Sequence, residues 1–302
     1  MRRFSVALAA VMVPGLGVGV CGTDNHALAA ILYGTNGSSL VTLDPDSQTA
    51  QIIGPHGITG LQSLAFHSTE GLFYGTTDSF GYGQNALWSI DPFSGAATQV
   101  GALPAGIYGL DYDPARDVLF GVGLSSQLYR ISTQPFSAQY IGSAGRNFTY
   151  SLAIDDAQDV FYVESRWNTE LFSINPATGA GTTVGTVQIP GMAWIWLSSM
   201  AYDQDADRLI GVDSGLRWVV SIDPKTMTTT SLGGAYSLPF GISGLDYASV
   251  VIPEPSTLAV WSLLAALGIT LGSSCRLWRY LIKAPASRNG GQSWSGHEVS
   301  SC

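Results

Sequence analysis

The sequence predicts an all-β fold, and three observations lead to this prediction. The 302-residue chain contains 36 glycines and is 11% aromatic but only 12% charged, a balance typical of domains built from short strands and tight turns. Short apolar runs alternate with turn signals between residues 31 and 250. The same runs recur in the same order at a nearly constant spacing, which indicates a repeat architecture.

The first two motifs of the repeat are expected to form neighbouring strands. The first reads small residue, Leu or Met, any residue, then an aromatic residue or Ile. It occupies residues 63–66, 109–112, 151–154, 199–202 and 244–247. A second motif, rich in Leu, aromatic residues and Gly, follows the first four copies at 72–75, 119–122, 161–164 and 209–212. An extra copy of the second motif, at 32–35, has no first motif before it.

The third motif is a strand that runs into an Asp-Pro or Asn-Pro turn. It is found at 40–45, 87–92, 171–176 and 219–224, with a degenerate copy at 128–132. Proline presets φ and the Asx side chain bonds the backbone, so these dipeptides start turns. A fourth strand is expected to end each unit near Gly54, Gly101, Gly142, Gly185 and Gly233.

Units of about 45 residues with four short strands predict the blades of a β-propeller. The unmatched copies at 32–35 and 244–247 would share one blade, so that strands from both ends of the domain close a ring of five blades. Six blades remain an alternative if the irregular stretch 187–198 contains further strands. An open sandwich is the remaining alternative.

The charge and the positions of the cysteines limit which partners and cross-links are expected for the repeat domain. Between residues 31 and 252 there are 19 Asp and Glu against 7 Lys and Arg, a net charge of −12. Nucleic acid is therefore not expected as a partner, since phosphate contacts need clustered basic residues. Cys21, Cys275 and Cys302 all lie outside this region, so no disulfide framework is predicted for it.

The N-terminus has the parts of a secretory signal peptide, assigned to residues 1–30. Arg2 and Arg3 precede an uncharged run, and Ala27-Leu28-Ala29 before Ala30 supplies the small residues that signal peptidases require. Cleavage is expected after Ala29 or Ala30. An uncleaved anchor is the alternative interpretation.

The C-terminal region predicts a single membrane-spanning helix at 256–275. These 20 residues carry no charge, enough to cross a bilayer core of about 30 Å at about 1.5 Å per residue. Arg276, Arg279 and Lys283 follow and would hold that end in the cytoplasm, with the tail 284–302, which leaves the 31–250 domain outside.

Pro253-Glu254-Pro255 stands directly before the predicted span, and its prolines keep the segment extended. This order of Pro-Glu-Pro, span and basic cluster, within residues 251–283, resembles bacterial PEP-CTERM sorting signals. The resemblance implies processing by an exosortase, a membrane-embedded transpeptidase-like enzyme, and often a link to exopolysaccharide production. An ordinary tail anchor with a chance Pro-Glu-Pro is the alternative.

No specific catalytic set is present in the sequence. The domain has two histidines, His56 and His67, and lacks the common nucleophile, zinc and phosphate-loop motifs. Asp203, Asp205 and Asp207 have a spacing that could suit calcium, although the same repeat position favours Asp for turn bonding alone. No other cofactor is indicated.

Exposed aromatic residues are the other candidate binding groups. Trp194 and Trp196 lie in the longest irregular insertion, where they could stack on a sugar or anchor a partner, or simply pack between blades.

We therefore expect an exported protein, held in the cell membrane with its propeller outside or released to the surface or medium. The leading interpretation is a non-enzymatic propeller that binds a protein or a polysaccharide. A secreted hydrolase or lyase and a structural matrix component are the alternatives. Several carboxylates at the mouth of the central channel would favour the enzyme, whereas an unremarkable channel with an aromatic face would favour binding.

Overall fold

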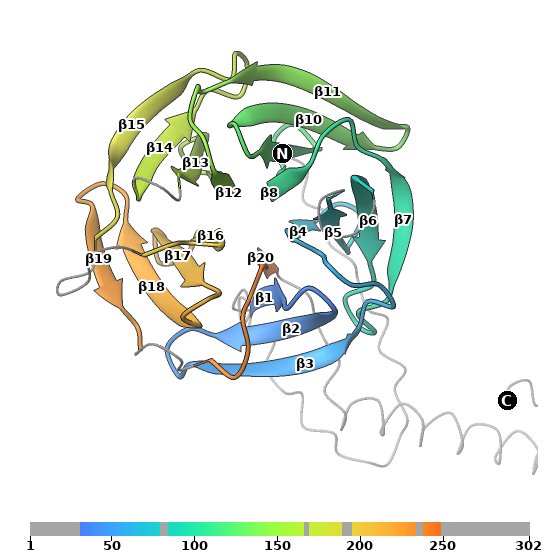
Figure 1. The fold of residues 1–302 in the computed structure, drawn as a ribbon, viewed down its shortest axis with the longest axis horizontal. Coiled ribbons are helices and arrows are strands. Elements are labelled where there is room, and N and C mark those ends of the chain that lie inside the picture. Colours follow the sequence, from blue (N-terminus) through green and yellow to red (C-terminus); the bar gives the residue numbers. More distant parts are fainter. Residues whose placement is uncertain (1–30, 79–83, 166–168, 189–194, 234–237, 249–302) are drawn as a thin grey trace, which may run out of the picture. The chain divides into compact units, whose positions relative to one another are not determined.

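A computed structural model describes residues 31–78, 84–165, 169–188, 195–233 and 238–248, which form five four-stranded antiparallel sheets arranged as the blades of a β-propeller (Figure 1). No helix occurs in these residues. The all-β, five-bladed prediction is confirmed, and residues 187–188 and 195–198 of the irregular stretch contain no strand.

Each blade runs from an inner strand beside the central axis to an outer strand at the rim (Figure 1). Blade 1 contains β20 (Gly244–Ala248), β1 (Ile31–Thr35), β2 (Ser39–Asp44) and β3 (Thr49–Pro55). Blade 2 contains β4 (Ala65–His67), β5 (Leu72–Thr77), β6 (Ala86–Ile90) and β7 (Ala97–Ala102). Blade 3 contains β8 (Ile107–Asp113), β9 (Val118–Gly123), β10 (Gln127–Thr133) and β11 (Phe136–Ser143).

The last two blades follow the same order. Blade 4 contains β12 (Thr149–Asp155), β13 (Val160–Ser165), β14 (Glu170–Ile174) and β15 (Gly181–Thr186). Blade 5 contains β16 (Ser199–Asp203), β17 (Arg208–Asp213), β18 (Trp218–Asp223) and β19 (Thr228–Ser231).

Blade 1 closes the ring with strands from both ends of the domain, as the unmatched motif copies predict. β20 pairs antiparallel with β1 over five residues, from Ile31 opposite Ala248 to Thr35 opposite Gly244. Every inner strand therefore has a partner within its own blade.

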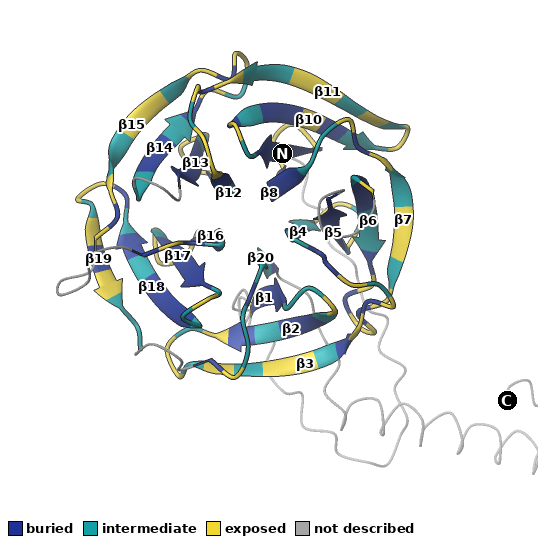
Figure 2. Cartoon of the chain, in the orientation of Figure 1, coloured by how far each residue is buried: buried dark blue, intermediate teal, exposed yellow. Residues whose placement is uncertain are grey.

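The core consists of five apolar clusters, one between each pair of neighbouring blades. The cluster between blades 3 and 4, for example, joins Phe120 of β9 to Phe161 of β13, whose rings meet edge to face with centroids 4.8 Å apart. Both faces of the second and third strands are covered in this way, so β9 is buried along its whole length, while the outer strands alternate (Figure 2). Burying one such large side chain contributes about 1.5–3 kcal/mol.

A glycine at or just after the end of each fourth strand lies close to the next blade. A Cβ atom added at Gly54, Gly101, Gly142, Gly185 or Gly233 would approach a neighbouring atom closer than 3.0 Å. In each case that atom belongs to the connection between the third and fourth strands of the following blade, or to the start of its fourth strand. At Gly233 the contact is Gln48 of blade 1, so the series runs around the whole ring.

The predicted Asx turns occur between the third and fourth strands of four blades. Oδ1 of each Asp or Asn accepts hydrogen bonds from the N–H groups two and three residues later. The four residues are Asp44, Asp91, Asn175 and Asp223. These turns present the atoms that contact the glycines of the preceding blade, except in blade 3, whose turn lacks the Asx residue.

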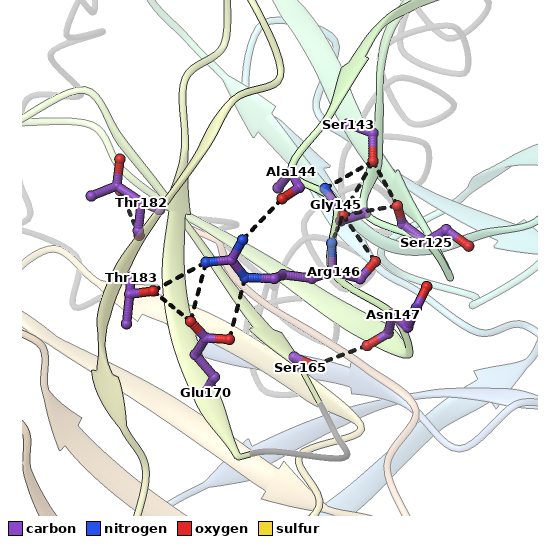
Figure 3. A network of polar contacts seen from close by, with 12 residues as sticks. Ser125, Ser143, Ala144, Gly145, Arg146, Asn147, Ser165, Glu170, Thr182 and Thr183 are labelled. Atoms are coloured by element: carbon purple, nitrogen blue, oxygen red, sulfur yellow. Dashed lines mark hydrogen bonds and ion pairs between the residues drawn. The ribbon is translucent and has the colours of Figure 1, made fainter.

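Arg146 fixes the connection between blades 3 and 4 (Figure 3). Its guanidinium pairs with Glu170 at 3.3 Å and donates to Oγ1 of Thr183 at 3.1 Å and to the Ala144 carbonyl at 3.1 Å. It also lies 5.5 Å from the ring centre of Phe172. Arg146 thus connects Ala144, which directly follows the last strand of blade 3, to Glu170 and Thr183 of blade 4.

Substituting a rim glycine should weaken blade packing. We expect Gly142→Ala to lower the free energy of unfolding by about 2 kcal/mol, because its Cβ would meet the backbone at Thr178 and Gly179. Urea titration followed by tryptophan fluorescence measures this change. The matched control is Gly215→Ala, where only the Asp213 side chain lies within 4 Å, at 3.3 Å, and where we expect a change within about 1 kcal/mol. Equal effects of the two substitutions would contradict the packing argument.

Candidate functional site at the channel mouth

The five inner strands β4, β8, β12, β16 and β20 surround the central opening (Figure 1). In the first motif of each inner strand, successive residues face opposite neighbouring blades. The second and fourth residues pack on the preceding blade, as Tyr112 stacks on His67 at 4.1 Å and Tyr202 on Tyr162 at 5.9 Å. The first and third residues face the following blade. Side chains of one strand therefore connect three consecutive blades.

A pocket of about 160 Å³ lies where the inner strands run into their first turns. Its lining combines aromatic rings with carboxylates and other polar groups: Phe66, Ser68, Asp111, Tyr112, Pro114, Ile154, Asp156, Tyr202, Gln204, Asp246 and Tyr247. We refer to this pocket as the channel mouth. Residues from all five blades contribute to its lining.

Two aspartates of the channel mouth connect neighbouring inner strands. Oδ2 of Asp246 in β20 accepts the N–H of Phe66 in β4 at 2.5 Å, and its Oδ1 accepts the N–H of Tyr247. Oδ2 of Asp111 in β8 accepts the N–H of Ile154 in β12 at 2.7 Å, and its Oδ1 accepts the N–H of Tyr112. Each carboxylate thus satisfies two backbone donors at strand edges that no sheet partner reaches.

Glycines two residues earlier allow these contacts. A Cβ on Gly109 would lie 2.5 Å from the backbone of Ser151 and Leu152, and one on Gly244 would lie 2.5 Å from that of Ser63. Only the two motif copies that begin with Gly carry Asp at the third position. Glycine brings the next strand close, and the aspartate two residues later bonds it.

A third polar contact joins blades 4 and 5. Gln204, in the first turn of blade 5, donates from Nε2 to the carbonyl of Ile154 at 2.8 Å. Backbone atoms of β12 are therefore bonded from both sides, by Asp111 and by Gln204.

Burial makes the channel-mouth carboxyls weak acids. It raises the pKa of Asp246 to about 7, against the backbone hydrogen bonds that favour the ionised form. Burial, together with the carboxylates of Asp246 and Asp156, raises the pKa of Asp111 well above its ordinary value. Asp156 lies at the exposed edge of the channel mouth. There, partial burial and the carboxylates of Asp113 and Asp155 raise the pKa of Asp156 to about 6.

The arrangement is better suited to binding and bracing than to nucleophilic catalysis. Both oxygens of Asp111 and of Asp246 already accept backbone hydrogen bonds. No histidine, cysteine or lysine lines the pocket. Among the described residues, no group of three or more His, Cys, Asp or Glu side chains is placed to hold a metal ion.

Of the three aspartates considered for calcium, Asp203 ends β16, and Asp205 and Asp207 lie in the turn that follows. Asp203 accepts the N–H of Ala206 and pairs with Arg208 at 3.2 Å. Asp207 pairs with Lys225 and accepts the Tyr202 hydroxyl. Asp205 is exposed in the same turn.

Trp196 is 46% exposed, and its backbone N–H donates to Oδ2 of Asp213 at 3.1 Å. It does not line the channel mouth. Trp194 lies outside the described residues. Trp196 is therefore not brought to the pocket that the inner strands form.

Both histidines of the domain are buried in blade junctions. His56 connects blades 1 and 2, with Nδ1 at 2.8 Å from the Gly95 carbonyl and Nε2 at 2.9 Å from Oγ1 of Thr35. His67 stacks on Tyr112 between blades 2 and 3. Burial lowers the pKa of both imidazoles, which keeps them neutral.

The predicted targeting residues lie outside the described part of the chain. They are the signal-cleavage residues Ala27, Ala29 and Ala30 and the sorting-signal residues Pro253, Glu254, Pro255, Arg276, Arg279 and Lys283. The helix predicted at 256–275 also lies outside, and the part of the chain that is described contains no helix that could span a membrane.

Asp111 and Asp246 are the site residues that the sequence analysis did not single out. A signal for them exists, because Gly-Leu-Asp-Tyr occurs twice, at 109–112 and 244–247, while the other three copies have Ala at the third position. Buried aspartate in place of alanine needs a hydrogen-bonding reason.

Asp246 should make stability fall as pH rises. Between its ordinary pKa of 3.8 and its folded pKa of about 7, only the folded state keeps the proton, so the free energy of unfolding decreases over this range. In Asp246→Asn this contribution is absent, and the thermal midpoint should decline less between pH 4.5 and pH 7.5. Calorimetry of both proteins across that interval provides the comparison. Parallel pH profiles would show that Asp246 is ionised throughout.

Comparisons with known proteins do not place the chain in a family. No model of a protein family matches the chain, and no curated protein does. Among solved structures, a chain described as "Crystal structure of Nidogen/Laminin Complex" has a TM-score of 0.49 and 11% identity, over 72% of this chain and 98% of that chain. At this similarity the match carries no functional argument, and the five-bladed propeller rests on the strand pairing itself.

Proposed function

We propose that the chain is an exported cell-envelope or surface protein whose propeller binds a protein or a polysaccharide without catalysing a reaction. The observation that carries the binding role is the state of the channel mouth. Its two inner carboxylates already accept backbone hydrogen bonds, and no nucleophile with an adjacent base lines the pocket.

Export and membrane attachment are supported by the sequence at the two ends of the domain. The signal-peptide pattern, the uncharged stretch 256–275 and the basic residues after it form a consistent topology. The resemblance of Pro253-Glu254-Pro255 and its surroundings to a sorting signal adds an exosortase-like processing enzyme as a partner.

The closed blade is compatible with processing at both ends. Ile31 and Ala248 are the terminal pair of the β1–β20 ladder. Cleavage after Ala29 or Ala30 removes residues that precede this pair, and cleavage near Pro253 removes residues that follow it. Every pair of the β1–β20 ladder would remain in the processed domain.

Mass spectrometry of the protein's two ends, after separation of membrane and medium, tests this proposal. We expect an N-terminus at Ala30 or Ile31 and a C-terminus near Pro253–Pro255. Deletion of Ser256–Lys283 is the matched variant, and it should appear in the medium as a folded domain. An intact C-terminus in the membrane fraction, or a deletion variant that stays in the membrane, would contradict a processed and released protein.

A secreted hydrolase or lyase is the second candidate, because three carboxyl groups with raised pKa values, those of Asp111, Asp156 and Asp246, gather at the channel mouth. Of these, Asp156 lies at the exposed rim and could act as an acid or a base. If the protein is an enzyme, it should release reducing ends from a polysaccharide, and Asp156→Asn should reduce that rate by about 100-fold or more. We expect no activity in either protein, and an Asp156-dependent rate would replace the binding role.

A further inference from the structure

A larger groove lies away from the channel, between blades 3 and 4. Its volume is about 510 Å³, within the range of about 300–1,000 Å³ usual for ligand pockets. Its lining combines an apolar surface with two guanidinium groups: Arg116, Phe120, Arg130, Gln139, Tyr140, Ile141, Pro176 and Ala177. We call it the rim groove. Residues of β10 and β11, two strands labelled in Figure 1, line one side of it.

The centre of this wall is a row of side chains across three strands. Arg130 of β10 is paired with Phe120 of β9 on one side and with Gln139 of β11 on the other. Directly paired residues project from the same face of an antiparallel sheet. A register shift beside Tyr129 leaves Ile141 unpaired and adds it to the groove. An apolar ring, a guanidinium and an amide therefore stand side by side.

Arg130 departs from the repeat at this position. The equivalent residues of the other four blades are small hydroxyl residues, Thr42, Ser89, Ser173 and Ser221. Two of these hydroxyls bond back to their own sheet, Ser89 to the Thr98 carbonyl and Ser173 to the Thr182 carbonyl. Blade 3 instead carries a long cation here, in a repeat that also lacks the Asx-Pro turn.

Arg130 is also the exception among the basic residues of the described structure. Arg116, Arg146, Arg208 and Lys225 each form an ion pair with a carboxylate. Arg217 donates to the Pro239 carbonyl. Arg130 is exposed, and neither an ion pair nor a hydrogen bond joins it to any described residue. In a region with a net charge of −12, a guanidinium without a partner inside a groove indicates an anionic ligand.

We propose that the rim groove binds a carboxylate-bearing sugar unit of an acidic polysaccharide, with Arg130 as the residue that recognises the carboxylate. This inference rests on the proposed binding function and specifies its ligand. The guanidinium provides paired N–H donors that match a carboxylate, and the neighbouring Gln139 amide can bond a ring hydroxyl.

The remaining lining suits a sugar ring better than an acidic peptide. Ile141, Pro176 and Ala177 offer apolar contacts to the C–H face of a ring, and Tyr140, 54% exposed, adds an aromatic edge. Arg116 is already paired with Asp113 and Asp159, so only one unneutralised cation is available. One guanidinium matches the one carboxylate of a single sugar unit.

Isothermal titration calorimetry of the full-length protein with oligogalacturonate tests the proposal. We expect saturable binding, and we expect Arg130→Gln to weaken it by about tenfold or more, the loss of a charge-assisted hydrogen-bonded pair. Arg130→Lys keeps the charge but not the paired donors and should also weaken binding. The matched control is Arg217→Gln, which removes the same charge from blade 5 and should leave the affinity within about twofold.

A neutral malto-oligosaccharide and an oligoglutamate peptide complete the experiment. We expect neither to bind through Arg130. If oligogalacturonate does not bind, or binds equally well to Arg130→Gln, the assignment of the rim groove is overturned. If the neutral sugar binds and Arg130→Gln does not affect it, the proposed binding function stands while this inference fails. An Arg130-dependent affinity for oligoglutamate above that for oligogalacturonate would identify an acidic peptide as the ligand instead.

Discussion

Each blade can bury both faces of its middle strands only because the next blade lies directly against it. For this contact, the backbones of neighbouring blades must approach each other closely in two places, at the outer rim and near the central axis. At the rim, glycines such as Gly142 leave room for the following turn. Near the axis, Gly109 and Gly244 leave room for the following inner strand. The apolar clusters between these two lines of contact then reach the density that a stable β domain without disulfides requires.

The close approach of the inner strands near the axis leaves backbone N–H groups that need hydrogen-bond acceptors. The inner strands do not pair with one another, so some of their N–H groups face the channel without a sheet partner. Asp111 and Asp246 accept several of these hydrogens, but they do so as buried acids close to each other. The carboxyl groups that connect neighbouring inner strands are thus the same groups whose charged form is disfavoured by burial. A channel mouth built in this way has little capacity left for acid–base chemistry.

Function is then expected where a blade departs from the common pattern rather than where the blades agree. Blade 3 is the divergent copy, with Arg130 in place of a small hydroxyl residue and a different turn after β10. Its Arg130 side chain lines the rim groove. A charged side chain that the fold does not use is free to recognise a ligand. The closed ring behind it holds that side chain in a fixed place.

The repeat pattern by itself predicted an all-β fold and a blade shared by both ends, because strand periodicity and Asx-Pro turns are local properties. It favoured five blades but left six blades and an open sandwich as alternatives, and the strand pairing of the structure decided among them. It also located the glycines of the fourth strands, but not the reason for them, since the atoms they accommodate belong to the next repeat. The roles of Asp111 and Arg130 could be decided only by tertiary structure. In the sequence the first is the third residue of a predicted strand motif, and the second is a residue of a degenerate repeat. Asp111 accepts the N–H of Ile154, and Arg116 pairs with Asp159, and in both cases the partner lies 43 positions away along the chain. Whether Arg130 has such a distant partner is likewise decided only by the folded structure.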